Sequence, residues 1–334
     1  MRSFLNVTVF LTTLLAIVLG GGFIYGYSAW VGAGPLSEMK TVIIERGSGV
    51  SSIAQELQKA KVISSATIFK AVVRISNKQT SLKAGEYEFE PRISMHDVLD
   101  KIARGQIVQR HITIAEGLTS WQVIQIINAA DGLTGVIEKI PAEGSLLPET
   151  YSFTRDQNRA EIIRGMESSM ERTIDALWPK RMEGLPFDNP KQALVLASIV
   201  EKETGIASER ARIAGVFVNR LRAGMPLQTD PTVIYALTKG EIKNDGMGPL
   251  GRRLLRKDLL ETDSPYNTYK YPGLPPGPIA NPGRAAIEAT LHPEQHDFFY
   301  FVADGTGGHV FSKTLKEHEI NVVKWRKIRK EQGN

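Results

Sequence analysis

The stretch "KQALVLASIVEKET", residues 191–204, predicts a helix of about four turns whose middle is buried. An Asn-Pro pair precedes it as cap and first-turn proline, and a glycine follows it as a stop. With residues placed about 100° apart, the large apolar side chains point within roughly 20° of Glu203, and Glu201 points almost the opposite way. We therefore expect Glu203 to end the buried stripe and Glu201 to reach solvent.

The position predicted for Glu203 is one at which a charged carboxylate is costly. Burial penalises the charged form and raises the pKa, so that the neutral acid is populated near neutral pH, as a general acid requires. The alternative is a buried ion pair with an arginine, for which Arg210 and Arg220 are the candidates. Helix geometry alone leaves both interpretations open.

The N-terminal segment predicts a membrane anchor. No residue between Arg2 and Glu38 is charged, and a bilayer is crossed by about 20 apolar residues. The stretch ends in Tyr25, Tyr27 and Trp30, as an interfacial aromatic belt does. A cleaved signal peptide is the alternative, but its apolar core is shorter, about 7–15 residues. The positive N-terminal end favours a cytoplasmic N-terminus and export of the remaining chain.

The composition narrows the function classes. The 334 residues are 42% apolar and 23% charged, which is typical of a globular protein, and the formal charge of +5 is spread along the chain. No zinc spacing or phosphate-binding glycine loop supports a nucleic-acid partner. The absence of cysteine excludes disulfides and thiol nucleophiles. The segment "HPEQH", residues 292–296, lacks the spacing of a zinc site, so we expect neither metal nor cofactor.

The pattern predicts an α+β fold with three parts. Residues 1–37 form a cytoplasmic tip, a transmembrane anchor and a Gly/Pro hinge. Residues 38–108 alternate strands and helices in a small α+β module, and residues 109–334 form a larger mixed α/β domain with Glu203 near the end of a helix. In the small module, "ERGSGVSSIAQEL" and "LKAGEYEF" resemble a LysM-type domain, which implies affinity for N-acetylated glycans. The alternative is a spacer domain that binds nothing.

Three successive segments of the larger domain carry a more specific resemblance. They are "ASIVEKETGIASERARIAGVFVNRLRAGMPLQTDPTVIYAL", "SPYNTYKYPGLPPGPIANPG" and "FVADGTGGHVFS". With "EGLTSWQV" and "EGSLLPETYSF", they resemble, in order, the motifs of the YceG-like (MltG) family of endolytic murein transglycosylases. Together with the LysM-like segment and the anchor, the resemblance covers nearly the whole chain.

The resemblance implies a lyase that cuts peptidoglycan strands between MurNAc and GlcNAc without water. Glu203 would protonate the glycosidic oxygen and then help the C6 hydroxyl of the sugar to attack, leaving a 1,6-anhydro-MurNAc end. Glu203-Thr204 resembles the Glu-Ser pair of other lytic transglycosylases. The resemblance further implies an inner-membrane protein with its domains outside the cytoplasm. Penicillin-binding proteins and other cell-wall synthesis machinery would be its partners, and strand termination its role.

Further polar and aromatic residues are expected around Glu203. Asp230 precedes a proline at the head of an apolar helix, which favours an N-cap over a second catalytic carboxylate. The resemblance places Gln228, Thr229 and Tyr235 in the cleft. The segment "SPYNTYKYPGLPPGPIANPG" is rich in Pro and Gly, which predicts a rigid loop. This loop is expected to present Tyr266, Asn267 and Tyr269 to a sugar.

Three alternatives remain open at this stage. The loop that carries these three residues could be an ordered surface loop without a ligand. A muramidase that uses Glu203 with Asp230 would give reducing ends in place of anhydro ends. A membrane-anchored protein that binds glycan without catalysis would release nothing.

Overall fold

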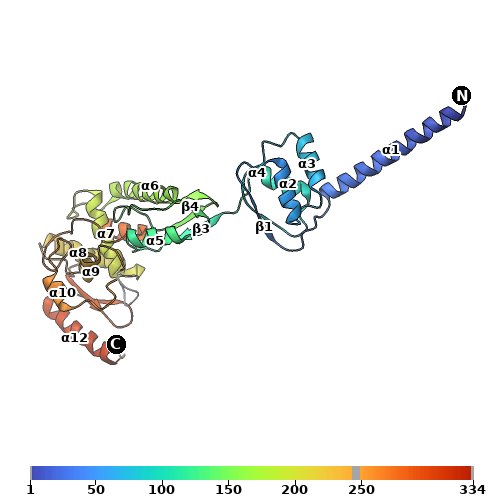
Figure 1. Cartoon of the computed structure of the whole chain (residues 1–334). Helices are drawn as coiled ribbons and strands as arrows, with labels where there is room; N and C mark the ends of the chain where they lie inside the picture. The colour runs from blue at the N-terminus through green and yellow to red at the C-terminus, as the bar shows by residue number, and fades with distance from the viewer. Residues whose placement is uncertain (1, 243–248, 332–334) are drawn as a thin grey trace. The chain divides into compact units, whose positions relative to one another are not determined.

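A computed structural model describes residues 2–242 and 249–331, which form two compact units (Figure 1). The first unit is Met1–Arg110 with Ser152–Asp156, and the second is His111–Tyr151 with Gln157–Asn334. The described part is a mixed α/β structure that begins with one long helix.

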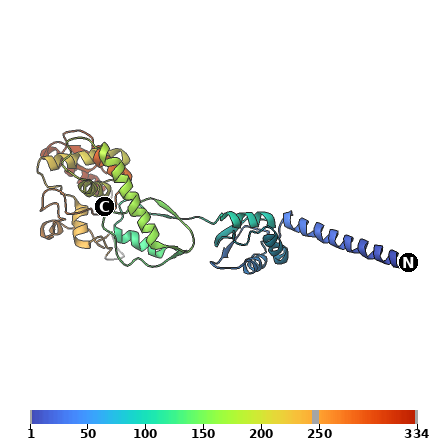
Figure 2. The ribbon, with the colours of Figure 1, turned by 90° about the horizontal axis from the view of Figure 1, so that it is seen from above.

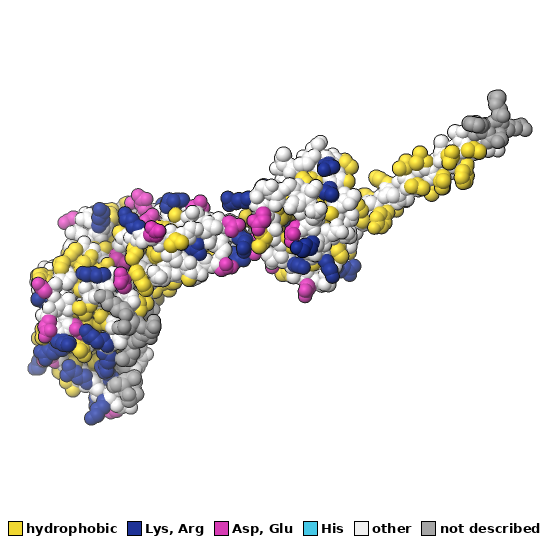
Figure 3. Space-filling model, viewed as in Figure 1, with side chains coloured by type: hydrophobic (Ala, Val, Ile, Leu, Met, Phe, Trp, Pro, Cys, Tyr) yellow, Lys and Arg dark blue, Asp and Glu magenta, His cyan; other side chains and the backbone are white. Residues whose placement is uncertain are grey.

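Helix α1, Arg2–Val31, is the apolar N-terminal element. Its segment Asn6–Val31 has 26 residues and contains an 18-residue window with a mean hydropathy of 2.3, none of which is buried in the protein. Figure 3 shows hydrophobic side chains along this helix. By length and composition it can cross a membrane. The side chain of Arg2 and the terminal amino group, on which the predicted orientation rests, lie outside the described residues.

The rest of the first unit is a two-stranded sheet with three helices. Strands β1 and β2 pair antiparallel, with Val42 opposite Tyr87. The sequence pattern predicted one helix after each strand, whereas the structure has a further helix, α3, which the Ser65 side chain caps. The elements are β1 (Lys40–Ile44), α2 (Val50–Lys59), α3 (Ala66–Ile75), β2 (Gly85–Phe89) and α4 (Met95–Arg104).

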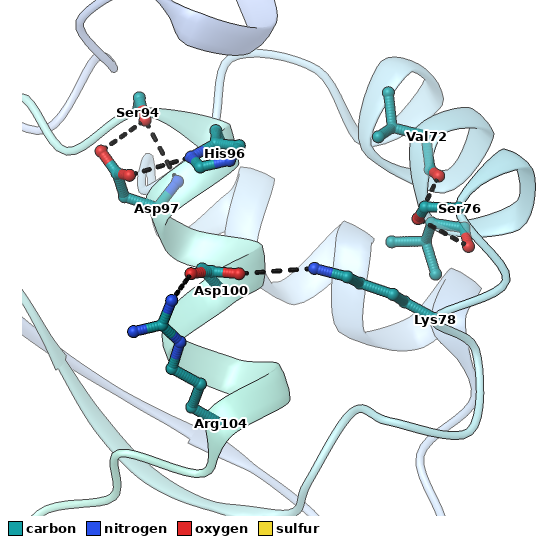
Figure 4. Close-up of polar contacts among 9 residues, drawn as sticks. Val72, Ser76, Lys78, Ser94, His96, Asp97, Asp100 and Arg104 are labelled. Atoms are coloured by element: carbon teal, nitrogen blue, oxygen red, sulfur yellow. Dashed lines mark hydrogen bonds and ion pairs between the residues drawn. The ribbon is translucent and has the colours of Figure 1, made fainter.

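Polar contacts fix helix α4 within this unit (Figure 4). The Ser94 hydroxyl accepts a hydrogen bond from the Asp97 backbone N–H at 3.1 Å and so caps the helix. The Asp100 carboxylate contacts Lys78 Nζ at 3.4 Å, which ties the loop after α3 to α4, and it also contacts Arg104 at 2.6 Å.

The second unit is larger and mainly helical (Figure 2). Its small sheets pair β3 with β5, β4 with β6 and β7 with β8. The elements are β3 (Arg110–Thr113), α5 (Ser120–Ala129), β4 (Leu133–Thr134), β5 (Thr150–Phe153), β6 (Gln157–Asn158), α6 (Arg159–Leu177), the 3-10 turn η1 (Trp178–Lys180), α7 (Pro190–Glu203), α8 (Ala207–Arg222), α9 (Asp230–Thr238), α10 (Arg256–Glu261), α11 (Arg284–Leu291), β7 (Tyr300–Ala303), β8 (His309–Ser312) and α12 (Leu315–Glu331).

Helix α7 is the centre of this unit. The Asn189 side chain accepts from the Gln192 backbone N–H and begins the helix, as predicted. Helices α8 and α11 both pack against it, and the run from Val195 to Val200 is buried without a break. The Ser198 hydroxyl, which is also buried, accepts from the Ile279 N–H at 3.0 Å and so attaches the Pro- and Gly-rich loop to the helix. This packing holds the C-terminal end of α7, where Glu203 lies, in a fixed position.

Two further elements complete the surroundings of that helix end. Strands β7 and β8 form an antiparallel hairpin, with Phe301 opposite Phe311. The hairpin contacts α8 on one side, where the Phe217 and Phe301 rings meet edge to face at 5.8 Å. Helix α12 contacts both strands of the hairpin.

Candidate active site

Glu203 lies in a cleft of about 440 Å³ in the second unit. Acidic and basic groups line the cleft together, namely Asp230 and the buried Arg220. Aromatic side chains also line the cleft, among them Tyr269 and Tyr300. Such a mixture suits a ligand that is polar at its edges and apolar on its faces.

The carboxyl group of Glu203 accepts a short hydrogen bond from the Thr229 hydroxyl. Thr229 is itself fixed, because its backbone N–H donates to the Thr268 hydroxyl at 3.1 Å. Burial raises the pKa of Glu203 to about 7. The charge of Asp230 also raises this pKa, whereas the hydrogen bond from Thr229 lowers it. His309 and Arg220 lower the pKa by smaller amounts. Glu203 can therefore hold a proton near neutral pH.

The ion-pair alternative for Glu203 is not what the structure shows. Arg220 donates instead to backbone carbonyls, to Phe299 O at 2.6 Å and Leu227 O at 2.8 Å. Arg210 contacts Glu201 at 3.7 Å. Within residues 2–242 and 249–331, no salt bridge involves Glu203. Its proton is thus not displaced by a neighbouring cation.

The prediction that Glu201 reaches solvent is wrong. Its side chain is only 5% exposed. The Gly283 backbone N–H donates to its Oε2 at 2.8 Å, and the Arg210 guanidinium lies 3.7 Å from its Oε1. The pKa of Glu201 is also raised, because burial outweighs the hydrogen bond from Gly283. Other segments therefore cover both sides of the helix end.

Asp230 differs from its predicted role as an N-cap. Thr229 precedes α9, and Asp230 is the first helical residue. Its Oδ1 accepts a hydrogen bond from the Tyr269 hydroxyl at 2.6 Å. Burial and this contact raise the pKa of Tyr269, so the phenol stays protonated. Gln228, with φ of 53°, turns the chain into α9 and lines the same cleft.

The other predicted contact residues do not line this cleft. Asn267 is fully buried and donates to Leu259 O and Thr262 O, so its amide fixes the loop and does not face a sugar. Tyr235 lines a separate pocket of about 280 Å³, and the Tyr266 ring lies 5.0 Å from its ring. Thr204 is buried, and its hydroxyl accepts from the Ile206 N–H at 2.9 Å.

Sequence reasoning missed two parts of the surroundings. His309 Nδ1 lies 2.8 Å from Glu209 Oε2, and the His309 charge acts on Glu203. These residues stand 100 positions apart, and no local pattern joins them. Helix α12 also belongs to these surroundings, because Trp325 and three other residues of the helix line the cleft. The spacing of these four residues, three or four positions apart along the helix, is the sequence signal that could have found them.

The fold and the cleft together define a mixed α/β protein with an N-terminal apolar helix and a glutamate of raised pKa in a cleft lined by aromatic side chains. A carboxyl group of raised pKa is what the general acid of an enzyme that cleaves glycosidic bonds requires. Residues 42–324 match the model of the YceG-like family. The chain belongs to this family, which confirms the resemblance seen in its motifs.

Named relatives and a solved structure agree with this membership. The chain is 35% identical to an endolytic murein transglycosylase of Bacillus subtilis, over 90% of this chain and 89% of the relative. It is 31% identical to an endolytic murein transglycosylase of Streptococcus pneumoniae, over 85% of this chain and 58% of that protein. A crystal structure of a YceG-like protein from Listeria monocytogenes aligns with a TM-score of 0.52 and 36% identity, over 85% of this chain and 98% of that one.

Proposed function

We infer that this chain is a lyase, an endolytic lytic transglycosylase that acts on peptidoglycan strands between MurNAc and GlcNAc. The observation that carries the inference is a protonatable Glu203 that lies in an aromatic cleft and has no salt-bridge partner among the described residues. Family membership and the names of the relatives support the same conclusion.

Glu203 performs both proton transfers in the proposed mechanism. Its neutral carboxyl group donates a proton to the glycosidic oxygen, and the bond from this oxygen to the anomeric carbon breaks. The resulting carboxylate accepts the proton of the C6 hydroxyl of the same MurNAc, whose oxygen bonds to the anomeric carbon. The products are a free GlcNAc hydroxyl and a 1,6-anhydro-MurNAc end, and Glu203 is again neutral. The Thr229 hydroxyl stabilises the intermediate carboxylate.

Asp230 has an electrostatic role in this mechanism. Its charge raises the pKa of Glu203 and so keeps the acid protonated. A hydrogen bond from Tyr269 holds the Asp230 carboxylate. In the muramidase alternative, Asp230 would instead activate water or attack the sugar.

The first unit is proposed to anchor the enzyme and to hold its substrate. Helix α1 spans the inner membrane with its N-terminus in the cytoplasm, and the later domains lie outside. Residues 38–108 bind glycan as a LysM-like domain, and the element order β1, α2, α3, β2 with an antiparallel sheet supports this assignment. Residues 109–334 are the catalytic domain. Penicillin-binding proteins are proposed as partners, and termination of nascent strands as the role.

Product analysis tests the proposed function. Full-length protein in detergent is incubated with purified peptidoglycan, and the released fragments are separated and weighed by mass spectrometry. We expect 1,6-anhydro-MurNAc ends, which lack one water relative to reducing ends. Reducing ends would establish the muramidase alternative, and binding without release would establish the non-catalytic one.

A further inference from the structure

Helix α12 places one stripe of side chains on the cleft that holds Glu203. The cleft-lining residues of this helix follow one another at intervals of three, four and three, which is the spacing of one helical face. They are Leu315, His318, Val322 and Trp325. The proposed mechanism uses none of these residues, although they share the cleft with the acid.

Ring stacking and a hydrogen bond attach α12 to the hairpin. The His318 ring stacks on the Tyr300 ring at 5.3 Å, with 23° between the planes. The Asn321 amide donates to the Ser312 hydroxyl at 3.0 Å. No residue of α12 is itself fully buried. The stripe is thus fixed in position while its side chains remain accessible from the cleft.

Trp325 is the residue of the stripe with the largest flat surface. It is half-buried and lines the cleft. The Arg329 guanidinium lies 5.4 Å from the ring centroid, which orients the indole. Among the residues that the structure describes, no other aromatic ring stacks on Trp325. An indole has two faces, and the guanidinium lies over one of them.

We propose that Trp325 is a stacking platform for one pyranose ring of the glycan strand and that α12 forms this subsite beside Glu203. The C–H groups of a pyranose face are apolar and slightly positive, and they match the electron-rich face of an indole. The neighbouring Arg220 and Tyr300 supply polar edges to the same cleft. This subsite rests on the proposed function, since the occupant is the strand that Glu203 cleaves.

Three variants of the full-length protein test the subsite. Trp325→Ala removes the platform, Trp325→Phe keeps a smaller one, and Val323→Ala alters a neighbour that is 65% exposed. We expect Trp325→Ala to raise KM for purified glycan strands about tenfold, with kcat within about twofold. Trp325→Phe should raise KM less, and Val323→Ala should leave it unchanged. Equal melting temperatures establish that α12 stays folded.

A fluorescence measurement separates stacking from a structural role. In the Glu203→Gln background, which should bind without turnover, N-acetylglucosamine oligomers should shift the emission spectrum. Trp325→Phe should remove that shift and Val323→Ala should retain it. An unchanged KM in Trp325→Ala, or a shift that survives in Trp325→Phe, overturns the subsite. If the shift depends on Trp325 but wild type releases no anhydro products, the subsite stands and the proposed function fails.

Discussion

Glu201 and Glu203, on the two sides of the α7 C-terminus, show how two buried glutamates can differ in their contacts. Burial raises the pKa of both Glu201 and Glu203. Glu201 accepts from the Gly283 N–H and lies beside Arg210, in contacts that join segments of the fold. Glu203 has the Thr229 hydroxyl as its neighbour and opens into the cleft. A raised pKa thus does not identify an acid by itself, because the group must also face the space that the substrate occupies.

The largest effect is expected from Glu203→Gln. The amide has nearly the same volume but acts neither as an acid nor as a base near neutral pH, so release of anhydro fragments should fall by about 10²–10⁴. Glu201→Gln should keep most of its turnover, because its oxygen can still accept from Gly283. Initial rates of anhydro-fragment release measure both variants. If a folded Glu203→Gln variant keeps near wild-type release and Glu201→Gln is inactive, then Glu201 is the acid and Glu203 is not.

The second test concerns stability on the Glu201 side. Glu201→Ala removes the acceptor of the Gly283 N–H and leaves Arg210, whose side chain is 11% exposed, without this carboxylate. We expect a loss of about 1–3 kcal/mol in the free energy of unfolding. Urea denaturation of the full chain measures it, with Glu201→Gln as the control that keeps an acceptor. A fully stable but inactive Glu201→Ala would show that this side takes part in chemistry.

The third test moves the pKa of Glu203 in both directions. Since the neutral form is the acid, activity should fall as the pH rises through about 7. Thr229→Val removes a hydrogen bond to the charged form, so this alkaline limb should move to higher pH by up to about one unit. Asp230→Asn removes a repelling charge and should move the limb to lower pH. Profiles of kcat/KM against pH measure the shifts, and two shifts of the same sign would contradict the electrostatic account.

Much of the secondary structure around Glu201 and Glu203 could be predicted from the sequence. Local signals are strong where a cap, a stop and a periodic run coincide. The Asn189 cap set the start of α7, and Thr119 with Gln122 forms the capping box of α5. The apolar stripe also predicted that Glu203 ends the buried face of α7, and the YceG-like motifs then selected it as the proposed catalytic glutamate.

The errors arise where contacts are made by distant segments. A helical projection assumes one buried face, whereas α8 and α11 both pack against α7, and the backbone of Gly283 contacts Glu201 across 82 positions. Asn267 could not be distinguished from a surface amide, because its direction depends on how the loop folds back on itself. The role of Trp325 was missed for the same reason, since the hairpin that α12 contacts fixes which face meets the cleft.

The smallest expected effect is the contribution of Glu203 to the pH dependence of the free energy of unfolding. The pKa of Glu203 is about 7 in the folded chain, against an ordinary value of 4.5 for a glutamate in water. The folded state therefore binds this proton more tightly, and wild type should lose stability as the pH rises from about 4.5 through 7.

Glu203→Gln lacks this titration, so its stability relative to wild type should improve over that interval and stay constant at higher pH. Water in the cleft screens the charge, and we expect a change on the order of 1 kcal/mol. Urea denaturation of both chains at pH values on either side of the interval measures it, and other carboxyl groups cancel in the difference. A relative stability that falls with pH would mean that the folded state favours the charged form of Glu203. The carboxyl group would then resemble an ion-paired structural residue, and the contrast with Glu201 would not hold.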